Sequence, residues 1–207
     1  DIFFVISGYL ITKIILKELF DKGSFNFLNF YERRARRILP MLFTVILVSL
    51  PFAWQILFHT NLIEYAKSIL SSLFFSSNFF FYFVTTEYAA ESSLLKPFLH
   101  TWSLGIEEQF YIIFPILLFL FFKFLKNYIF ILILVMLFLS IQFAEVIGSR
   151  NAELNFYFPI SRFWELLVGS SVAYLEINGA IIKSRFTRIF PFIGISLIFF
   201  AITFFNF

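Results

Sequence analysis

The fold is decided by residues 100–122, which read HTWSLGIEEQFYIIFPILLFLFF. They join a polar start to an apolar run that provides most of a bilayer crossing. An ionised side chain near hydrocarbon costs roughly 2.5–3.5 kcal/mol, so Glu107 and Glu108 are unusual at this position. His100 and Glu107 are seven residues apart and share a helix face, with Ser103 between them. The pattern favours a polar cluster facing the bundle interior or a wet cavity; a plain helix start with Ser103 as N-cap is the alternative.

The composition points to a helical membrane protein. Hydrophobic residues make up 60% of the 207 residues, charged residues make up 14%, and mean hydropathy is +0.89. A soluble domain of this size does not need so much apolar surface. The continuous apolar runs do not fit the alternating pattern of a membrane barrel, and the absence of cysteine excludes disulfides and thiolate sites. We therefore predict an all-α, polytopic transmembrane helical bundle.

Six stretches are predicted to span the bilayer: 2–20, 41–58, 103–122, 128–143, 161–175 and 189–207. Residues 62–84 are long enough to cross, but their many polar side chains predict burial among other helices or re-entry without crossing. If residues 62–84 do not cross, the basic turns after residues 122 and 182 lie on the same side of the membrane as the arginine-rich stretch at 33–37. This arrangement agrees with the enrichment of lysine and arginine in cytoplasmic loops. We favour that arrangement, which predicts the opposite side for His100, Glu107, Arg162 and Glu165.

Local spacing gives three further expectations. Gly8, in the first span, is expected to let another helix backbone approach closely. Pro40 is expected in the first turn of the second span, where a proline fits. Arg162 and Glu165 are three residues apart and are expected to pair on one helix face, most simply as a structural ion pair.

Four arginines occur within five residues: Arg33, Arg34, Arg36 and Arg37. Such a cluster beside a span is a topology signal in its own right. Guanidinium groups also bind phosphate through paired hydrogen bonds, so a cytosolic ligand with several phosphates, such as coenzyme A, would suit the cluster. An anionic lipid surface would suit it too.

Four stretches in this order resemble the acyltransferase 3 family of bacterial membrane O-acyltransferases. They are DIFFVISGYLI at 1–11, YERRARRILP at 31–40, HTWSLGIEEQFY at 100–111 and RFWEL at 162–166. The resemblance implies one membrane domain over residues 1–207, incomplete at both ends, in the bacterial cytoplasmic membrane. It also implies transfer of acetyl or another short acyl group from cytosolic acyl-CoA to a hydroxyl of a surface glycan. O-antigen, capsule, exopolysaccharide and peptidoglycan are the acceptors this implies, with no metal and no nucleic acid involved.

The family motifs assign roles to the candidate residues. The resemblance implies a clamp for coenzyme A phosphates at Arg33, Arg34, Arg36 and Arg37. It implies supporting catalytic roles for His100, Glu107 and Glu108, acceptor positioning at Ser103, and bracing or lining of the same cavity by Arg162 and Glu165. In this family the principal base is a histidine on a helix that precedes the match to Asp1. This chain is expected to lack that helix and to be inactive when isolated.

Two other classes of function remain as alternatives. A permease or flippase subunit would use midplane charges to line a substrate route, and it predicts discontinuous helices in two related halves. A membrane scaffold would use the arginines only for topology and lipid contact.

Overall fold

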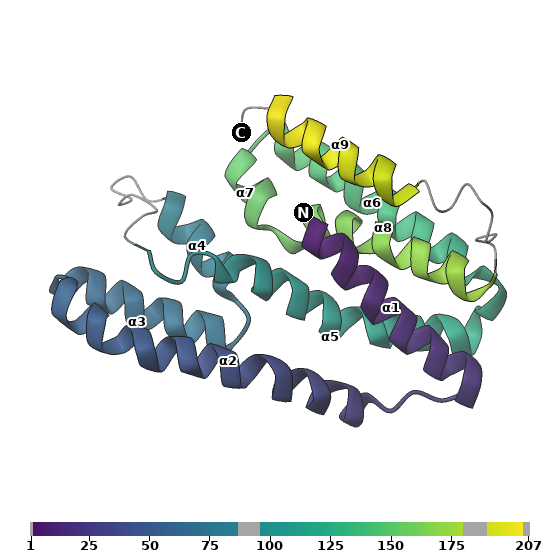
Figure 1. The fold of residues 1–207 in the computed structure, drawn as a ribbon, viewed down its shortest axis with the longest axis horizontal. Helices are drawn as coiled ribbons and strands as arrows, with labels where there is room; N and C mark the ends of the chain where they lie inside the picture. The colour runs from purple at the N-terminus through teal and green to yellow at the C-terminus, as the bar shows by residue number, and fades with distance from the viewer. Residues whose placement is uncertain (1, 87–95, 180–189, 205–207) are drawn as a thin grey trace. The chain divides into compact units, whose positions relative to one another are not determined.

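The computed structural model describes residues 2–86, 96–179 and 190–204, and every regular element in these ranges is a helix (Figure 1). The predicted all-α class is confirmed. The helices are α1 (Ile2–Lys22), α2 (Phe27–Ile56), α3 (His59–Leu73), α4 (Ser77–Thr86), α5 (Thr101–Phe124), η2 (Lys126–Tyr128), α6 (Ile129–Gly148), α7 (Ala152–Tyr157), α8 (Pro159–Ile177) and α9 (Phe190–Phe204). The chain divides into two compact units, Asp1–Tyr174 and Leu175–Phe207.

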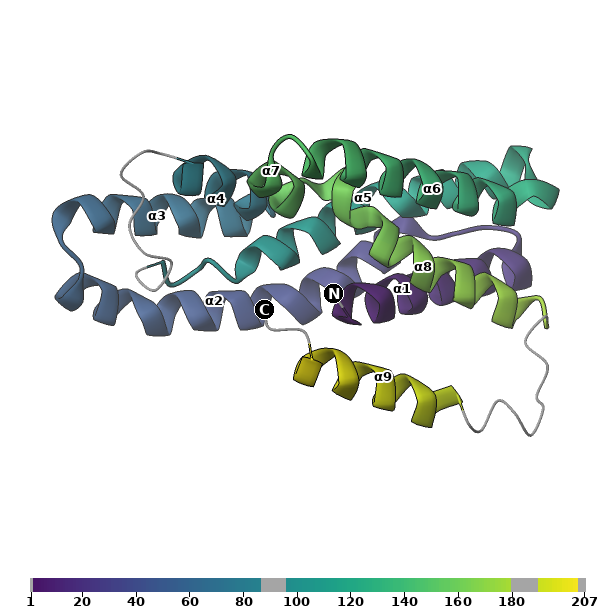
Figure 2. The ribbon, with the colours of Figure 1, turned by 90° about the horizontal axis from the view of Figure 1, so that it is seen from above.

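Helix α5 is central to the first unit. It packs against α1, α4 and α6, while α2 and α3 lie side by side in both ribbon views (Figures 1 and 2). Its buried stripe repeats every four residues through Ile106, Phe110, Phe114 and Leu118, all at most 1% exposed. A stripe with this period turns one face of a helix toward its neighbours, which explains the central position of α5.

Helices α1 and α8 meet where each carries a glycine. A Cβ at Gly8 would lie 1.9 Å from a backbone carbonyl oxygen of α8, and one at Gly169 would lie 1.9 Å from a carbonyl oxygen of α1. The hydroxyl groups of Thr12 and Ser170 are hydrogen-bonded beside this contact, 2.8 Å apart. The close approach expected at Gly8 is confirmed, since only residues without a side chain allow two backbones to come this near.

Replacing Gly8 with alanine should therefore separate α1 from α8, because the new methyl group would meet backbone that cannot rotate away. We expect a loss of about 1–3 kcal/mol, measured as a lower thermal midpoint of the full-length protein in detergent. Gly105→Ala is the graded control, because its nearest contact would be a side-chain oxygen at 3.1 Å. Equal midpoints for Gly8→Ala and the unchanged protein would contradict the prediction.

The ambiguous stretch 62–84 forms two helices instead of one. Helices α3 and α4 have 15 and 10 residues, and neither reaches the roughly 20 residues of a straightforward crossing. Phe75, between them, has a φ of 52°, a left-handed conformation that costs a bulky residue strain. Four of the polar side chains in this stretch are no more than 4% exposed: Ser68, Ser72, Ser77 and Asn78. Burial among other helices therefore accounts for these four side chains, whereas Lys67 is exposed.

The break between α3 and α4 is fastened to α5 by an amide side chain. Gln109 Nε2 donates to the Phe75 carbonyl oxygen at 2.7 Å and to Asn78 Oδ1 at 2.8 Å. Asn78 Nδ2 in turn donates to the Tyr157 carbonyl oxygen at the end of α7, at 3.1 Å. A backbone carbonyl that the helix break leaves without a helical partner is thus satisfied inside the bundle.

Two predicted helix boundaries are wrong. Helix α2 begins at Phe27, and Pro40 and Pro51 lie within it, so Pro40 is not in a first turn. A proline removes only one backbone hydrogen bond, and membrane helices tolerate this loss when nearby groups compensate. Near the other end of the first unit, α8 begins at Pro159, two residues before the predicted start at residue 161.

Three segments among the described residues are long and apolar enough to cross a bilayer: Phe27–Ile56, Thr101–Phe124 and Lys126–Gly148. Together with the composition, they make this a membrane protein. Crossing by α1 and by α8 stays a prediction. The second unit contains α9, an apolar helix of 15 residues. The predicted basic turn at Lys183, Arg185 and Arg188 lies outside the described residues.

Candidate functional site

A cavity of about 590 Å³ lies between α1, α2 and α5. Helix α2 contributes Arg34 and Arg37 to its wall, and α5 contributes Ser103, Glu107 and Glu108. The rest of the lining is apolar or aromatic, apart from the hydroxyls of Ser7 and Tyr111. Five of the ten predicted site residues therefore meet in one cavity.

The arginine cluster divides into two pairs. Arg34 and Arg37 are one turn apart and line the cavity, with Arg34 partly buried and Arg37 exposed, whereas Arg33 and Arg36 are rotated about 100° around α2, are exposed and lie outside the lining. Arg36 Nη2 lies 2.7 Å from Glu32 Oε1, and 79% of the Arg36 side chain is exposed. The structure therefore brings two of the four predicted clamp residues into the cavity.

Arg34 is held in place by aromatic rings. Its guanidinium carbon lies 4.5 Å from the ring centroid of Tyr111 and 5.8 Å from that of Phe30. Cation–π contacts of this kind are worth about 0.5–2 kcal/mol. The Tyr31 hydroxyl also donates to the Ile112 carbonyl oxygen at 3.0 Å, which ties α2 to α5 beside the cavity. These contacts keep the Arg34 head group within the cavity wall.

The two adjacent carboxylates have different surroundings. Glu107 faces the hydroxyls of Ser7 and Tyr111 and is attracted by the guanidinium groups across the cavity. Glu108 is only 8% exposed and is attracted by Arg34, and its Oε1 has no hydrogen-bond partner within the described part of the chain. The cavity therefore combines two cationic groups suited to an anion with a carboxylate and hydroxyls suited to a sugar alcohol.

The position of the arginines differs from the sequence-based expectation. The charge distribution predicted Arg34 and Glu107 on opposite sides of the membrane, but they line one cavity. The reason is the early start of α2 at Phe27, which places residues 33–37 about 9–15 Å inside the helix. At that depth the arginines reach the level of Glu107.

His100 lines a second cavity, of about 540 Å³, between α2 and the start of α5. The two cavities adjoin, because four residues line both: Arg37, Ile38, Ser103 and Leu104. Helix α5 begins at Thr101, so His100 is its N-cap, and Ser103 Oγ instead donates to the His100 carbonyl oxygen at 3.1 Å. The reading of Ser103 as N-cap is therefore wrong, and His100 and Glu107 line different cavities.

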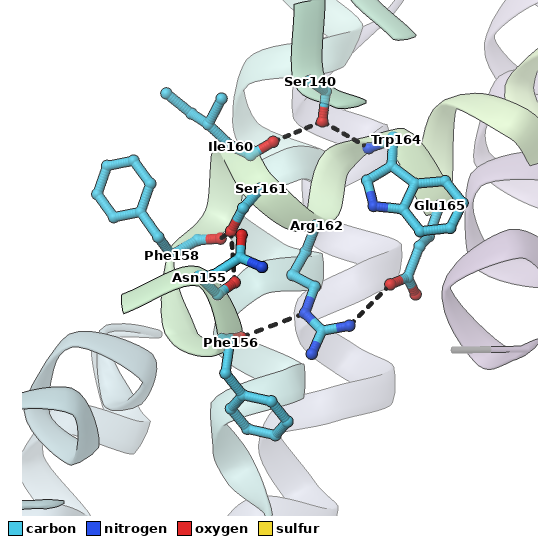
Figure 3. Close-up of polar contacts among 9 residues, drawn as sticks. All are labelled: Ser140, Asn155, Phe156, Phe158, Ile160, Ser161, Arg162, Trp164 and Glu165. Atoms are coloured by element: carbon cyan, nitrogen blue, oxygen red, sulfur yellow. Dashed lines mark hydrogen bonds and ion pairs between the residues drawn. The ribbon is translucent and has the colours of Figure 1, made fainter. Parts of the chain in front are cut away.

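Arg162 and Glu165 form the predicted ion pair, with Nη1 and Oε1 2.9 Å apart (Figure 3). Glu165 is 2% exposed, and Arg162 Nε also donates to the Phe156 carbonyl oxygen at 3.3 Å. Neither residue is part of the lining of the 590 Å³ cavity. The Arg162 guanidinium lies 5.8 Å from the ring centroid of Trp102, which does line it. The pair is thus placed to brace the cavity wall through Trp102.

Two cavity residues with hydroxyl groups, Ser7 and Tyr111, have no role predicted from the sequence. Tyr111 could have been found from spacing, because residues 103, 107 and 111 fall every four positions on one stripe of α5. Ser7 gives no such signal, since it lies on α1 and only the packing of α1 against α5 brings it to Glu107.

Replacing only one member of the Arg162–Glu165 ion pair should destabilise the protein more than replacing both members with apolar residues. Glu165→Ala would leave the Arg162 charge half-buried, and we expect a loss of about 3 kcal/mol in thermal or denaturant unfolding. The double variant Arg162→Met/Glu165→Leu should recover most of that loss, because two apolar side chains need no partner. A double variant as unstable as Glu165→Ala would contradict a simple ion pair.

Comparison with known proteins identifies the family. The acyltransferase domain family (acyltransferase 3) matches residues 1–207, so this chain belongs to that family of acyltransferases. An uncharacterized protein of Haemophilus influenzae is 37% identical over 180 residues, which cover 84% of this chain and 73% of that protein. No solved structure matches.

Two relatives with functional names are much longer than the matched region. A putative O-acetyltransferase of Staphylococcus aureus is 41% identical over 118 residues, which cover 57% of this chain and 19% of the relative. A peptidoglycan O-acetyltransferase (OatA) of Listeria monocytogenes is 36% identical over 128 residues, covering 61% of this chain and 20% of the relative. The matched part of this chain therefore spans about a fifth of either relative.

Proposed function

We propose that this chain forms the membrane part of an O-acyltransferase of the bacterial cytoplasmic membrane. The enzyme transfers acetyl or another short acyl group from cytosolic acyl-CoA to a hydroxyl of a surface glycan. One observation carries the proposal: Arg34, Arg37 and Glu107 line the same cavity, so an anionic donor and a hydroxyl acceptor can meet there. Family membership and the names of the Staphylococcus and Listeria relatives support it.

The arginines hold the donor in this proposal. Arg34 and Arg37 offer paired donors to an anionic group inside the cavity. Arg33 and Arg36 are exposed on the same turns of α2, where they can meet further phosphates outside it. Coenzyme A carries several phosphates at one end and the thioester at the other. A row of arginines that extends from inside the cavity to its outside therefore suits this ligand.

The chemistry is the attack of a sugar hydroxyl on a thioester. The hydroxyl oxygen forms a bond to the carbonyl carbon, the carbon–sulfur bond breaks, and coenzyme A leaves as a thiol that receives the hydroxyl proton. Guanidinium donors that face the cavity can stabilise the negative charge that develops on the carbonyl oxygen. Glu107, with Ser7 and Tyr111 beside it, orients the acceptor hydroxyl and the base that takes its proton.

The remaining site residues have supporting roles. Ser103 lines both cavities and positions the acceptor where they join. Glu108 balances the charge of Arg34, and His100 acts from the second cavity. Arg162 and Glu165 fix Trp102, whose ring offers an apolar face to a sugar. Peptidoglycan, O-antigen, capsule and exopolysaccharide are the acceptor candidates, and the name of the Listeria relative favours peptidoglycan.

Replacing arginines one at a time tests the clamp. Arg34→Ala in the full-length protein should reduce glycan acylation by about a hundredfold or more, because it removes a charge-assisted pair of hydrogen bonds and an oxyanion donor. Arg36→Ala should have a much smaller effect, since Arg36 is exposed and paired with Glu32. Acylation is measured by mass spectrometry of surface glycans, with membrane insertion checked for both variants. Equal effects of the two substitutions would remove the support for a clamp inside the cavity.

Glu107→Gln tests the acceptor side. The amide keeps the size of the side chain but loses the charge, so we expect kcat to fall by about 10²-fold while KM for acyl-CoA changes little. Steady-state kinetics with purified glycan and acyl-CoA give both constants. A thermal midpoint equal to that of the unchanged protein shows that the fold is intact. A lower midpoint with normal kcat would instead assign Glu107 to structure.

A further inference from the structure

The two adjoining cavities differ in chemical character. The 590 Å³ cavity contains guanidinium, carboxylate and hydroxyl groups. The 540 Å³ cavity is mostly apolar, with walls formed by Ile38, Met41, Leu42, Val45, Phe98 and Leu104. Its polar side chains are His100, Thr101, Arg37 and Ser103, and the last two lie on the border that it shares with the first cavity. Polar and apolar parts of one ligand would therefore separate between the two cavities.

Under the proposed function, the thioester carbonyl carbon of acyl-CoA would lie at the border between the two cavities. A thioester carbonyl beside Arg37 and Ser103 lies between the charged cavity, which suits the coenzyme, and the apolar cavity. An acetyl group needs room for only one methyl group beyond its carbonyl carbon. A longer acyl chain would instead enter the apolar cavity, where each methylene removed from water favours binding.

We propose that the 540 Å³ cavity is an acyl-chain pocket, so that this enzyme accepts medium-length acyl groups such as hexanoyl as well as acetyl. The inference rests on the proposed function and adds to it the class of donor. Leu42 and Phe98 are buried in the pocket wall, at 6% and 1% exposed. Val45 is 40% exposed and stands one turn beyond Met41 along α2, at the end of the pocket away from Arg37. Val45 is thus a residue that determines chain length.

Bulk at position 45 tests the pocket. The full-length protein in lipid vesicles is supplied with acetyl-CoA, butanoyl-CoA or hexanoyl-CoA and a glycan acceptor, and kcat/KM is measured for each donor. Val45→Phe should lower kcat/KM for hexanoyl-CoA by about tenfold or more while changing that for acetyl-CoA by less than about twofold. Leu47→Phe adds the same ring to α2 at a residue that is 68% exposed and lies outside the lining of both cavities, so it should change neither value.

The outcomes separate the pocket from the function. Transfer of hexanoyl by the unchanged protein, with selective loss in Val45→Phe, supports the pocket. Transfer of acetyl without butanoyl or hexanoyl overturns the pocket and leaves the proposed function standing. Equal loss for all donors in Val45→Phe also overturns it, because the cavity would then hold a membrane lipid or only support the fold. No transfer from any acyl-CoA overturns the proposed function, and the acyl-chain pocket falls with it.

Discussion

Ionised side chains part-way along apolar helices are the constraint on which this bundle depends. Near hydrocarbon each such group needs an opposite charge, a hydrogen-bond partner or water. Arg34 and Arg37 of α2 meet Glu107 and Glu108 of α5 across one cavity, where guanidinium groups attract both carboxylates and Glu107 also faces the hydroxyls of Ser7 and Tyr111. The packing of α1 closes the third side of that cavity. The packing of these helices and the composition of the cavity are therefore tied to one requirement, because the same charged side chains lie where α2 and α5 face each other.

The helical class and the identity of most polar residues of the cavity could be predicted from the sequence. Glu107 and Glu108 stand out because carboxylates are rare in a lipid-length segment, and Arg34 and Arg37 stand out as a cluster. The split of the arginines into two pairs follows from helical rotation, but only once the start of α2 is known. Spacing alone placed that start too late, because Pro40 resembles a first-turn residue while the helix continues through it.

Features that depend on the packing of distant segments could not be predicted. Ser7 reaches Glu107 only because α1 lies along α5. His100 lies just before the start of α5 and lines the second cavity instead of the one that contains Glu107. The polar residues of α3 and α4 gave no clue to their partners, since Gln109 satisfies the Phe75 carbonyl across 34 residues of sequence. Position in the chain says little about such contacts, which are set by tertiary structure.

The length of α2 has a consequence for the surrounding lipid. Its 30 residues extend about 45 Å, whereas the hydrocarbon core of a typical bilayer is about 30 Å thick. A mismatch of this size exceeds what a usual tilt of about 20° absorbs, so two or more turns must stand among the head groups or the bilayer must thicken locally. If those turns are at the N-terminal end, Arg33 and Arg36 lie at head-group level, and bilayer thickness sets how deeply the neighbouring Arg34 and Arg37 are immersed.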